Sequence, residues 1–331
     1  MRASTVGMKE NREMEKLFSG AGQQKVAVIG GGGFIGRSLV RKLVATGHVV
    51  RVGSQNPEKI QGLGKARGTG RVEFLKTSVN DAAQLDRLFD GVDAVVNLVS
   101  VMTPDVQTLH RINVEGARLA AVRAHLAGVK HYVHMSAIGA SLTSPGAYGR
   151  SKAAAERVVR DVFPDARLLR PSVVFGTDDS FFNLFALIAA LSPVLPVFAG
   201  RTYYQPVFVE DVAEAALRLL QPENAGLTVE AGGPDILSMR ELMAFVLEAS
   251  GRKRILLPIP QVVARLEATV LEKLPGHLLT RDQVAMMSVD NVVQPGAETL
   301  QTFGIHPASM GMVVPGYLNG SVCKLYRQLK A

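Results

Sequence analysis

The stretch "VAVIGGGGFIGRSLV", Val26 to Val40, decides the fold of this chain. A short continuous apolar run ends in four glycines, which is typical of a buried parallel strand followed by a tight turn. Gly30, Gly33 and Gly36 stand at a G-x-x-G-x-x-G spacing, and apolar residues then recur at helical intervals. Such a turn points the N–H groups of a helix start at an anion, so the segment predicts a pyrophosphate-binding turn. The alternative is a glycine-rich turn without a ligand.

Beyond the turn, strand-like apolar runs alternate with helical patterns. The strand-like runs are "HVVRV", "RVEFL", "DAVVNLV", "KHYVHMS" and "ARLLRPS". This alternation implies right-handed crossovers, so we predict the α/β class with a doubly wound parallel Rossmann sheet. After about Gly176 the pattern loosens into helical pieces and short strands, which predicts a smaller C-terminal α+β cap subdomain.

The same patterns suggest a division into domains. We expect a flexible N-terminal tail over residues 1–24 and an NAD(P)-binding Rossmann domain over residues 25–176. Residues 177–331 would form the cap and docking subdomain, with parts of 205–233 returning to the Rossmann sheet. The tail lacks the hydrophobic core of a signal peptide, so we interpret it as a mobile tail.

Composition limits the classes of protein to which the chain can belong. It has 331 residues, of which 47% are apolar, so it can build a full core. The formal net charge of +8 suits an acidic partner, an anionic membrane face or a phosphate-bearing ligand. The charges are scattered and there is no Trp, so we expect no nucleic-acid partner.

Neither a disulfide nor a metal centre is predicted. Cys323 is the single cysteine, which excludes an internal disulfide and a cysteine-based metal site. The seven histidines are dispersed, and His131 and His134 flank a strand core without a carboxylate at ligand spacing. We therefore expect no metal.

The end of the second strand bears on which dinucleotide binds. An acidic residue there would accept the ribose hydroxyls of NAD and repel the 2′-phosphate of NADP. This chain has Ser54 and Gln55 instead, while Arg37 and Lys59 could reach a 2′-phosphate. The pattern favours NADP(H) over NAD(H). The alternative is that Ser54 and Gln55 are merely polar loop residues and the adenine end is weakly selective.

A serine, a tyrosine and a lysine form the candidate catalytic group. Tyr148 and Lys152 are four residues apart, so on a helix they share a face. A nearby ammonium favours the phenolate, and the same lysine can hold ribose hydroxyls. Ser136 ends a predicted parallel strand, where such folds place their ligands, and its hydroxyl could polarise a carbonyl oxygen.

Several motifs together resemble the extended or atypical short-chain dehydrogenase/reductase family. They are the glycine turn, "NVEGA" (Asn113 to Ala117), Ser136, the Tyr-x-x-x-Lys pair and "LRPSVVFG" (Leu169 to Gly176). A narrower likeness, to the NADPH-binding accessory subunit of respiratory complex I, lies in the segment from Ser151 to Ala186, in "QPVFVEDVA" and in "LLTRDQVAMM". That resemblance implies a Rossmann domain with a C-terminal cap.

The narrower resemblance also implies partners and a location. The chain would hold a mainly structural nucleotide and dock beside complex I subunits near the quinone site. It would lie on the cytoplasmic face of the bacterial inner membrane, or on the matrix side of the inner mitochondrial membrane in a eukaryote. Many relatives have a Gly-Asp pair where Thr77 and Ser78 stand, so Ser78 and the Val79 backbone would have to contact the adenine.

Other candidate cofactor contacts follow the same groove. They are Phe34 and Ile35 in the turn, Leu98 and Val99 after "DAVVN", and Pro171 and Val174 after "ARLLR". The segment from Arg252 to Leu274 joins a basic cluster to an amphipathic helix, which is either an ordinary cap helix or a surface for a membrane complex or anionic lipid headgroups.

Three functions fit these observations. The chain could be an accessory or assembly subunit of complex I, or an active NAD(P)-dependent reductase, epimerase or dehydratase. The active enzyme could act on a quinone precursor or a sugar nucleotide. A regulatory nucleotide sensor is the third possibility. The predicted cap segments from Asp178 to Asn183 and from Thr202 to Phe208 are aromatic and carry few charges, which disfavours a sugar nucleotide as substrate.

Overall fold

The computed structural model describes residues 23–65, 68–272 and 280–318. Nearly all of the predicted N-terminal tail, and Cys323, lie outside these residues.

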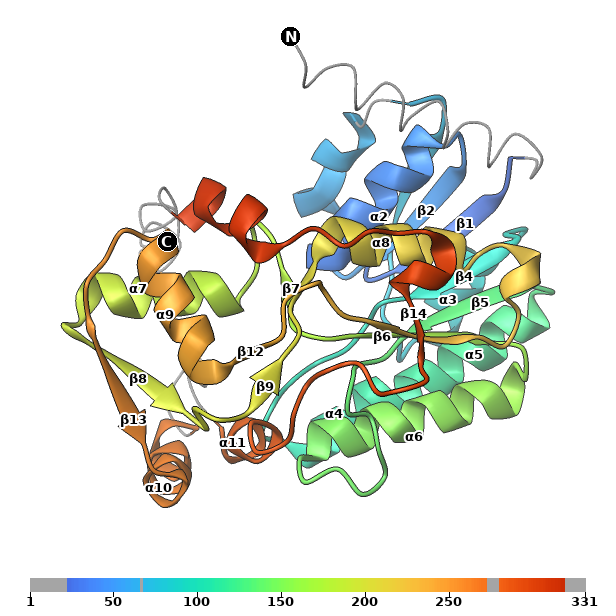
Figure 1. Ribbon diagram of the computed structural model, residues 1–331. Helices are drawn as coiled ribbons and strands as arrows, with labels where there is room; N and C mark the ends of the chain where they lie inside the picture. The colour runs from blue at the N-terminus through green and yellow to red at the C-terminus, as the bar shows by residue number, and fades with distance from the viewer. Residues whose placement is uncertain (1–22, 66–67, 273–279, 319–331) are drawn as a thin grey trace, which may run out of the picture.

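An eight-stranded parallel sheet organises the larger part of the molecule (Figure 1). Its strand order is β3-β2-β1-β4-β5-β6-β11-β14, so the chain changes direction across the sheet between β1 and β4. In open α/β sheets that switch point is where ligands bind, beyond the carboxyl ends of the strands. The strands are β1 (Lys25–Ile29), β2 (Val49–Ser54), β3 (Arg71–Lys76), β4 (Ala94–Asn97), β5 (His131–Met135), β6 (Arg167–Pro171), β11 (Thr228–Ala231) and β14 (Glu298–Thr299).

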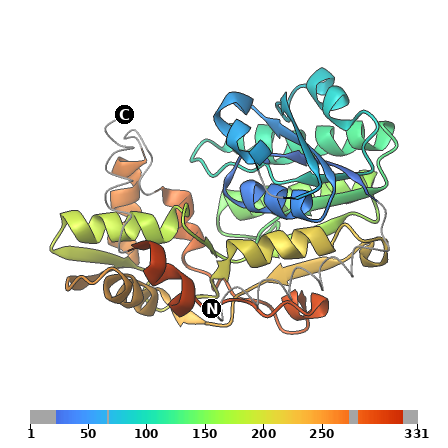
Figure 2. The ribbon, with the colours of Figure 1, turned by 90° about the horizontal axis from the view of Figure 1, so that it is seen from above.

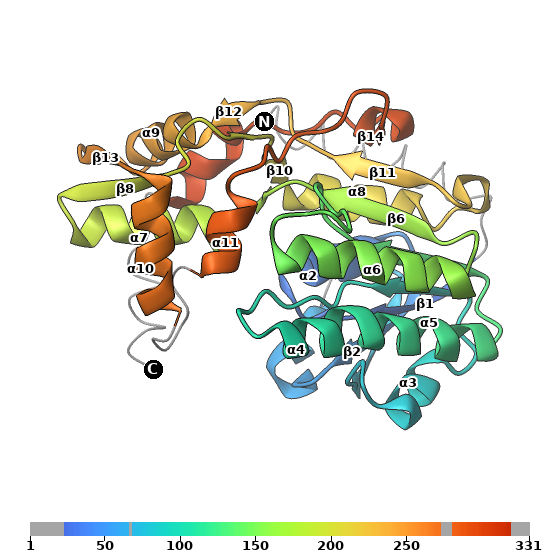
Figure 3. The same cartoon turned by 90° about the horizontal axis from the view of Figure 1, so that it is seen from below.

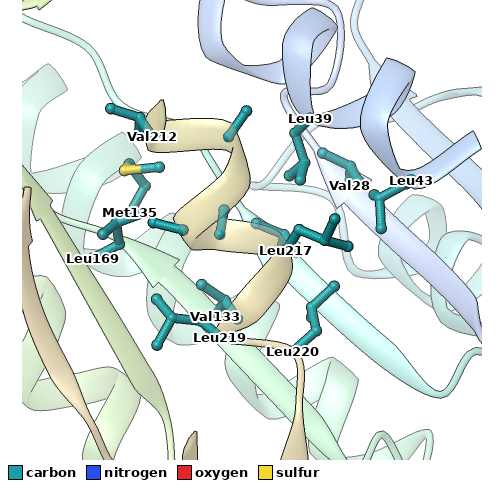
Figure 4. Packing of buried hydrophobic residues seen from close by; sticks show 14 of the residues in the cluster. Val28, Leu39, Leu43, Val133, Met135, Leu169, Val212, Leu217, Leu219 and Leu220 are labelled. Atoms are coloured by element: carbon teal, nitrogen blue, oxygen red, sulfur yellow. The ribbon is translucent and has the colours of Figure 1, made fainter. Parts of the chain in front are cut away.

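Helices cover both faces of this sheet because its strands are apolar on both sides. One face carries α2 (Phe34–Ala45) and α8 (Val209–Arg218), which pack on each other. Figure 4 shows Leu217 near the end of α8 together with Leu39 and Leu43 of α2 and with Val133 of the sheet. The other face carries α3 (Ala82–Phe89), α5 (Gly116–Leu126) and α6 (Ala147–Val162).

A smaller α+β part lies beside the sheet domain (Figure 2). Its own core joins α7 (Phe181–Leu191) and α9 (Met239–Ala249) with β8 (Val194–Phe198). Strand β13 (Ile255–Ile259) pairs in parallel with β8, and β12 (Leu237–Ser238) pairs antiparallel with β9 (Tyr203–Tyr204). We call this part the cap.

A helical pair completes the cap. It consists of α10 (Gln261–Leu271) and α11 (Arg281–Met286), which are joined through Ala264, Ala268 and Val284. Between the cap and the sheet, β7 (Val174–Phe175) and β10 (Val207–Phe208) form a short parallel pair. None of the described helices is both long enough and apolar enough to cross a bilayer.

The fold-class prediction is confirmed: the sheet is parallel, doubly wound and flanked by helices, with an α+β cap. Six strands were expected in the alternating part, and β11 and β14 add two more at one edge. Strand β11 lies within residues 205–233, parts of which were expected to return to the sheet, whereas β14 was not expected. Strand β14 is only two residues long and contains a Glu and a Thr, so it has no apolar run by which to recognise it.

Candidate functional site

The glycine turn between β1 and α2 has the geometry of an anion-binding loop. Gly30 has a φ of +78°, which residues with a Cβ rarely adopt, and its amide donates to Gly53 O over 2.9 Å. A Cβ on Gly36 would lie 2.5 Å from Gly30 O, so glycine is needed for α2 to begin this close to the turn. The N-cap residue of α2 is Gly33, which leaves space for a phosphate at the helix start.

A groove of about 180 Å³ lies beside this turn at the switch point of the sheet. Its lining includes Gly32, Ser54, Gln55, Val79 and Val99. No carboxylate is among the described residues that line it, as the end of "HVVRV" predicted. The groove can therefore hold the adenosine half of a dinucleotide without an acidic partner for the ribose.

Ser78 does not line this groove in the structure. Its amide donates to Gln84 Oε1 over 2.9 Å, and its hydroxyl accepts from Asn80 N over 3.3 Å. The neighbours Thr77, Val79 and Asn80 line the groove instead. Thr77 and Asn80 are lining residues that the sequence analysis did not include among the candidate cofactor contacts.

Arg37, expected near a 2′-phosphate, is paired with a carboxylate. Its Nη2 donates to Asp178 Oδ2 over 2.9 Å, and its Nη1 donates to Gly32 O over 3.3 Å. Asp178 belongs to the segment between β7 and α7, so this ion pair joins the phosphate turn to the entrance of the cap. The guanidinium lies beside the groove, and its charge is shared with Asp178.

Lys152 is fully buried in α6, beneath the other end of the site. Its side chain is 1% exposed, and its Nζ donates to Met135 O at the end of β5 over 2.6 Å. Burial lowers the pKa of Lys152 to about 8, although the charge of Glu156 opposes this shift. A ribose hydroxyl bound here would give the ammonium a further acceptor.

Tyr148 faces a cavity and is hydrogen-bonded to Ser100. Burial raises the pKa of its phenol, and the hydrogen bond with Ser100 opposes that shift only in part. Ser136 is 3% exposed, and within the described chain its Oγ has no hydrogen-bond partner. Buried hydroxyl groups normally have a hydrogen-bond partner, and a polar group of a ligand could be the partner of Ser136. The residues therefore fit a bound nicotinamide nucleotide.

A π-helical turn brings Asn113 into the same network. The turn covers His110–Glu115 between α4 (Val106–Leu109) and α5. The Asn113 amide accepts from Val101 N over 2.8 Å and donates to Ser151 Oγ over 3.0 Å. It therefore holds the segment after β4 against α6. The sequence analysis included Asn113 in the "NVEGA" motif, but the motif did not predict these hydrogen bonds.

His134 lies in the interior next to Lys152. Both of its ring nitrogens are buried and, in the described part of the chain, neither has a hydrogen-bond partner. Burial, and then the charge of Lys152, hold its pKa well below the ordinary value, so the ring is neutral. No cluster of His, Cys, Asp or Glu among the described residues is arranged to hold a metal ion.

An apolar cavity of about 290 Å³ opens between the sheet and the cap at Tyr148. Ala137 and Pro171 line it from the sheet, and Phe181, Met239 and Met286 line it from the cap. Its polar lining groups are neutral, such as Gln283 and Asn291, and no charged side chain is among the described lining residues. The cavity fits an uncharged, largely apolar molecule.

The remaining predicted contacts divide between the site and the core. Val99 lines the groove and Pro171 lines the apolar cavity. Ile35, Leu98 and Val174 pack against the core cluster that includes α2 and α8. Phe34 turns its ring toward Gly176, where an added Cβ would lie 3.2 Å from the ring.

Comparison with known proteins agrees with this geometry. A family model described as NAD(P)H-binding matches residues 30–180. The ceramide reductase of Caulobacter vibrioides is 30% identical over 239 residues, which cover 71% of this chain and 73% of that protein. This chain belongs to the extended short-chain dehydrogenase/reductase family.

Two further proteins are similar over more of the chain. The mitochondrial NADH dehydrogenase [ubiquinone] 1 alpha subcomplex subunit 9 of Arabidopsis thaliana is 29% identical over 302 residues, covering 85% of this chain and 73% of that protein. The crystal structure of a nucleoside-diphosphate-sugar epimerase from Staphylococcus aureus superposes with a TM-score of 0.71 at 18% identity, covering 89% of this chain and 99% of that one. The latter likeness shows the fold. The predicted resemblance to the short-chain dehydrogenase/reductase family is thus confirmed.

Proposed function

We propose that this protein is an NAD(P)H-binding accessory or assembly subunit of respiratory complex I, in which the nucleotide is mainly structural. The observation that carries this proposal is the extent of the similarity. The NAD(P)H-binding model stops at residue 180, whereas the similarity to the complex I subunit of Arabidopsis thaliana covers 85% of the chain. The similarity therefore extends well beyond the nucleotide-binding fold, which supports a cap of the same kind.

We propose NADP(H) as the bound nucleotide. The groove offers hydroxyl and amide groups, Ser54 and Gln55, where an NAD-selective site has a carboxylate. Arg37 lies beside Gly32 at the edge of the same groove. A 2′-phosphate there would compete with Asp178 for the guanidinium, so the preference is moderate.

The outer surface of the cap supports a peripheral location at a membrane complex. Helix α10 buries its alanines, Ala264 and Ala268, and exposes Val262 and Leu266, which are 80% and 71% exposed. Large apolar side chains exposed on one helix are suited to contact with a partner. Ile255 of β13 is also exposed, and Lys253 adds a positive charge nearby.

We therefore infer contact with complex I subunits near the quinone site and with an anionic membrane surface. The protein would lie on the cytoplasmic side of a bacterial inner membrane, or on the matrix side of the mitochondrial one. An exposed apolar face flanked by a positive charge is what such an interface needs.

Two measurements test the proposal. NADPH at a hundredfold excess over its dissociation constant should stabilise the purified protein by about 2.7 kcal/mol. The absence of a shift in melting temperature with both NADPH and NADH would contradict nucleotide binding. In solubilised membranes the protein should co-migrate with complex I, and a complex that remains intact without it would contradict the accessory role.

A second function, reduction of an apolar carbonyl compound, is favoured by the cavity beside Tyr148. NAD(P)H bound at the site would supply a hydride. Because burial raises the pKa of Tyr148, the phenol stays protonated near pH 7 and can donate its proton to the oxygen of a reduced carbonyl. The neutral lining argues against a sugar nucleotide, whose diphosphate needs cationic partners. Consumption of NADPH with a long-chain ketone, abolished by Tyr148→Phe, would establish this function.

A further inference from the structure

Helix α6, which carries Tyr148 and Lys152, begins without a capping side chain of its own. Its N-cap residue is Gly146, and the residue before it is Pro145. The Ser144 hydroxyl, the nearest local candidate, points to Met286 Sδ over 3.4 Å. The first N–H groups of a helix have no partner inside the helix, so they need acceptors from elsewhere.

A carboxylate from the cap supplies those acceptors. Asp282 of α11 accepts from Ala147 N through Oδ1 and from Tyr148 N through Oδ2, the second over 3.1 Å. More than 130 residues of sequence separate donor and acceptor. A negative charge at this position also interacts favourably with the helix dipole. Asp282 therefore caps α6 from another part of the fold.

The first turn of α6 is shaped to receive α11. A Cβ on Gly146 would lie 2.5 Å from Met286 Cγ, and one on Gly149 would lie 3.2 Å from Met286 Sδ. At Gly149 the nearest obstacle is local, because an added Cβ would lie 2.2 Å from Ser144 Oγ. The close approach of α11 therefore favours glycine mainly at Gly146, the N-cap position.

Helix α11 contacts three functional surfaces at once. Val284 packs on Ala264 and Ala268 of α10, and Gln283 and Met286 line the apolar cavity. Asp282 holds the start of α6. Figures 1 and 3 show α11 between α10 and the beginning of α6. The exposed helix of the cap is thus connected to the Tyr148 and Lys152 helix through one short element.

We infer that Asp282 is a positioning residue for the nicotinamide end of the site. By capping α6 it fixes Tyr148 at the cavity wall and Lys152 beneath the ribose position, so nucleotide affinity depends on the seating of α11. The inference has two halves: Asp282 caps α6, and nucleotide affinity depends on that cap. Only the second half rests on the proposed function. The capping itself is a property of the protein without a ligand.

Amide hydrogen exchange of the ligand-free protein tests the first half. Asp282→Ala should speed exchange in peptides covering residues 144–152 by about tenfold, since a lost cap typically opens a helix start to that extent. Asp282→Asn keeps one acceptor oxygen and should fall between Asp282→Ala and wild type. Glu267→Ala, which removes an exposed carboxylate from α10, should match wild type.

Titration with NADPH tests the second half. Asp282→Ala should weaken binding about three- to tenfold, and Glu267→Ala should leave it unchanged. Unchanged exchange at residues 144–152 in Asp282→Ala would overturn the inference, as would an equal increase in all peptides. If wild-type protein binds no nucleotide, the proposed function fails while the exchange data still decide the capping role. Should Asp282→Ala not fold, Asp282→Asn decides by the same comparison.

Discussion

The two ends of the proposed nucleotide site, a nicotinamide end and an adenosine end, are built in different ways. At the nicotinamide end, Lys152 and Ser136 are almost completely buried, and Asn113 and Asp282 hold the helix that carries Lys152 and Tyr148. At the adenosine end, Ser54 and Gln55 line an open groove and Arg37 is shared with Asp178 in a partly exposed ion pair. One end is fixed by burial, whereas the other is held by surface contacts.

This difference indicates where affinity and selectivity reside. Contacts with a buried charge are strong because water cannot replace them, so the nicotinamide end should dominate affinity. Exposed ion pairs contribute little, so selectivity between NADP and NAD at the other end should be moderate and easy to change. The following predictions run from the largest expected effect to the smallest.

Two glycines of the turn between β1 and α2 should differ in whether substitution affects mainly stability or mainly nucleotide affinity. Gly36→Ala should lower the free energy of unfolding by about 2–4 kcal/mol, since its Cβ would lie 2.5 Å from Gly30 O and 2.6 Å from Gly31 Cα. Gly33→Ala meets only Gly30 O, at 3.2 Å, and should lose less stability than Gly36→Ala while losing nucleotide affinity. Urea unfolding and NADPH titration measure the two effects. Equal losses of stability in the two variants would contradict this ranking of the two positions.

Lys152 and Tyr148 should contribute unequally to the affinity for NADPH. Lys152→Ala should weaken NADPH binding about ten- to a hundredfold, because it removes a charged hydrogen bond worth about 1.5–3 kcal/mol. Tyr148→Phe should change binding less than about threefold. Calorimetric titration compares them, and equal losses would contradict the assignment of nucleotide binding to Lys152.

Burial of Lys152 should also appear in the pH dependence of stability. The folded chain releases this proton near pH 8, whereas the unfolded chain holds it to about pH 10.4. Between these values the unfolded state binds more protons, so the free energy of unfolding rises with pH.

Lys152→Met should remove that rise. It should also stabilise the ligand-free protein at pH 7 by about 1–3 kcal/mol, because the buried charge is gone. Thermal unfolding from pH 7 to 10.5, taken as the difference between variant and wild type, checks both points. A parallel dependence on pH in the two proteins would show that Lys152 does not titrate in this range.

The adenosine end should respond least. Asp178→Asn frees Arg37 for a 2′-phosphate and should raise the preference for NADPH over NADH about three- to tenfold. Glu115→Gln, which removes the carboxylate of an exposed ion pair with Arg118, is the matched control. The measurement is the dissociation constant of each variant for NADPH and for NADH. An unchanged ratio of the two constants in Asp178→Asn would place the 2′-phosphate away from Arg37.

The sequence predicted the parts of the site that depend on local geometry. The glycine spacing, the strand-end Ser136 and the four-residue interval from Tyr148 to Lys152 all follow from how a strand, a turn or a helix places its own side chains. Those residues lie where expected, around the switch point of the sheet. The lack of a carboxylate at the end of β2 could also be predicted from the sequence, because it depends only on the residues that follow "HVVRV".

What the sequence missed depends on contacts between distant segments. Asp178 and Asp282 are ordinary surface carboxylates until the cap folds against the sheet, when they meet Arg37 and the start of α6. Ser78 looked like an adenine contact, but the hydrogen bond of its amide to Gln84 depends on how α3 sits. Strand β14 exists because the sheet edge pairs with it, not because of its own residues.

The sequence by itself predicted the extended short-chain dehydrogenase/reductase fold, and it placed the proposed phosphate turn and the Ser136, Tyr148 and Lys152 candidates on their elements. Periodicity and glycine placement suffice for those, since each acts over a few residues. Only the tertiary structure showed that Asp282, from the cap subdomain, accepts the first hydrogen bonds of α6. It also showed that Arg37 is paired with Asp178, and that the described lining of the cavity beside Tyr148 is apolar and uncharged. These properties arise where two folded surfaces meet, so no single segment contains them.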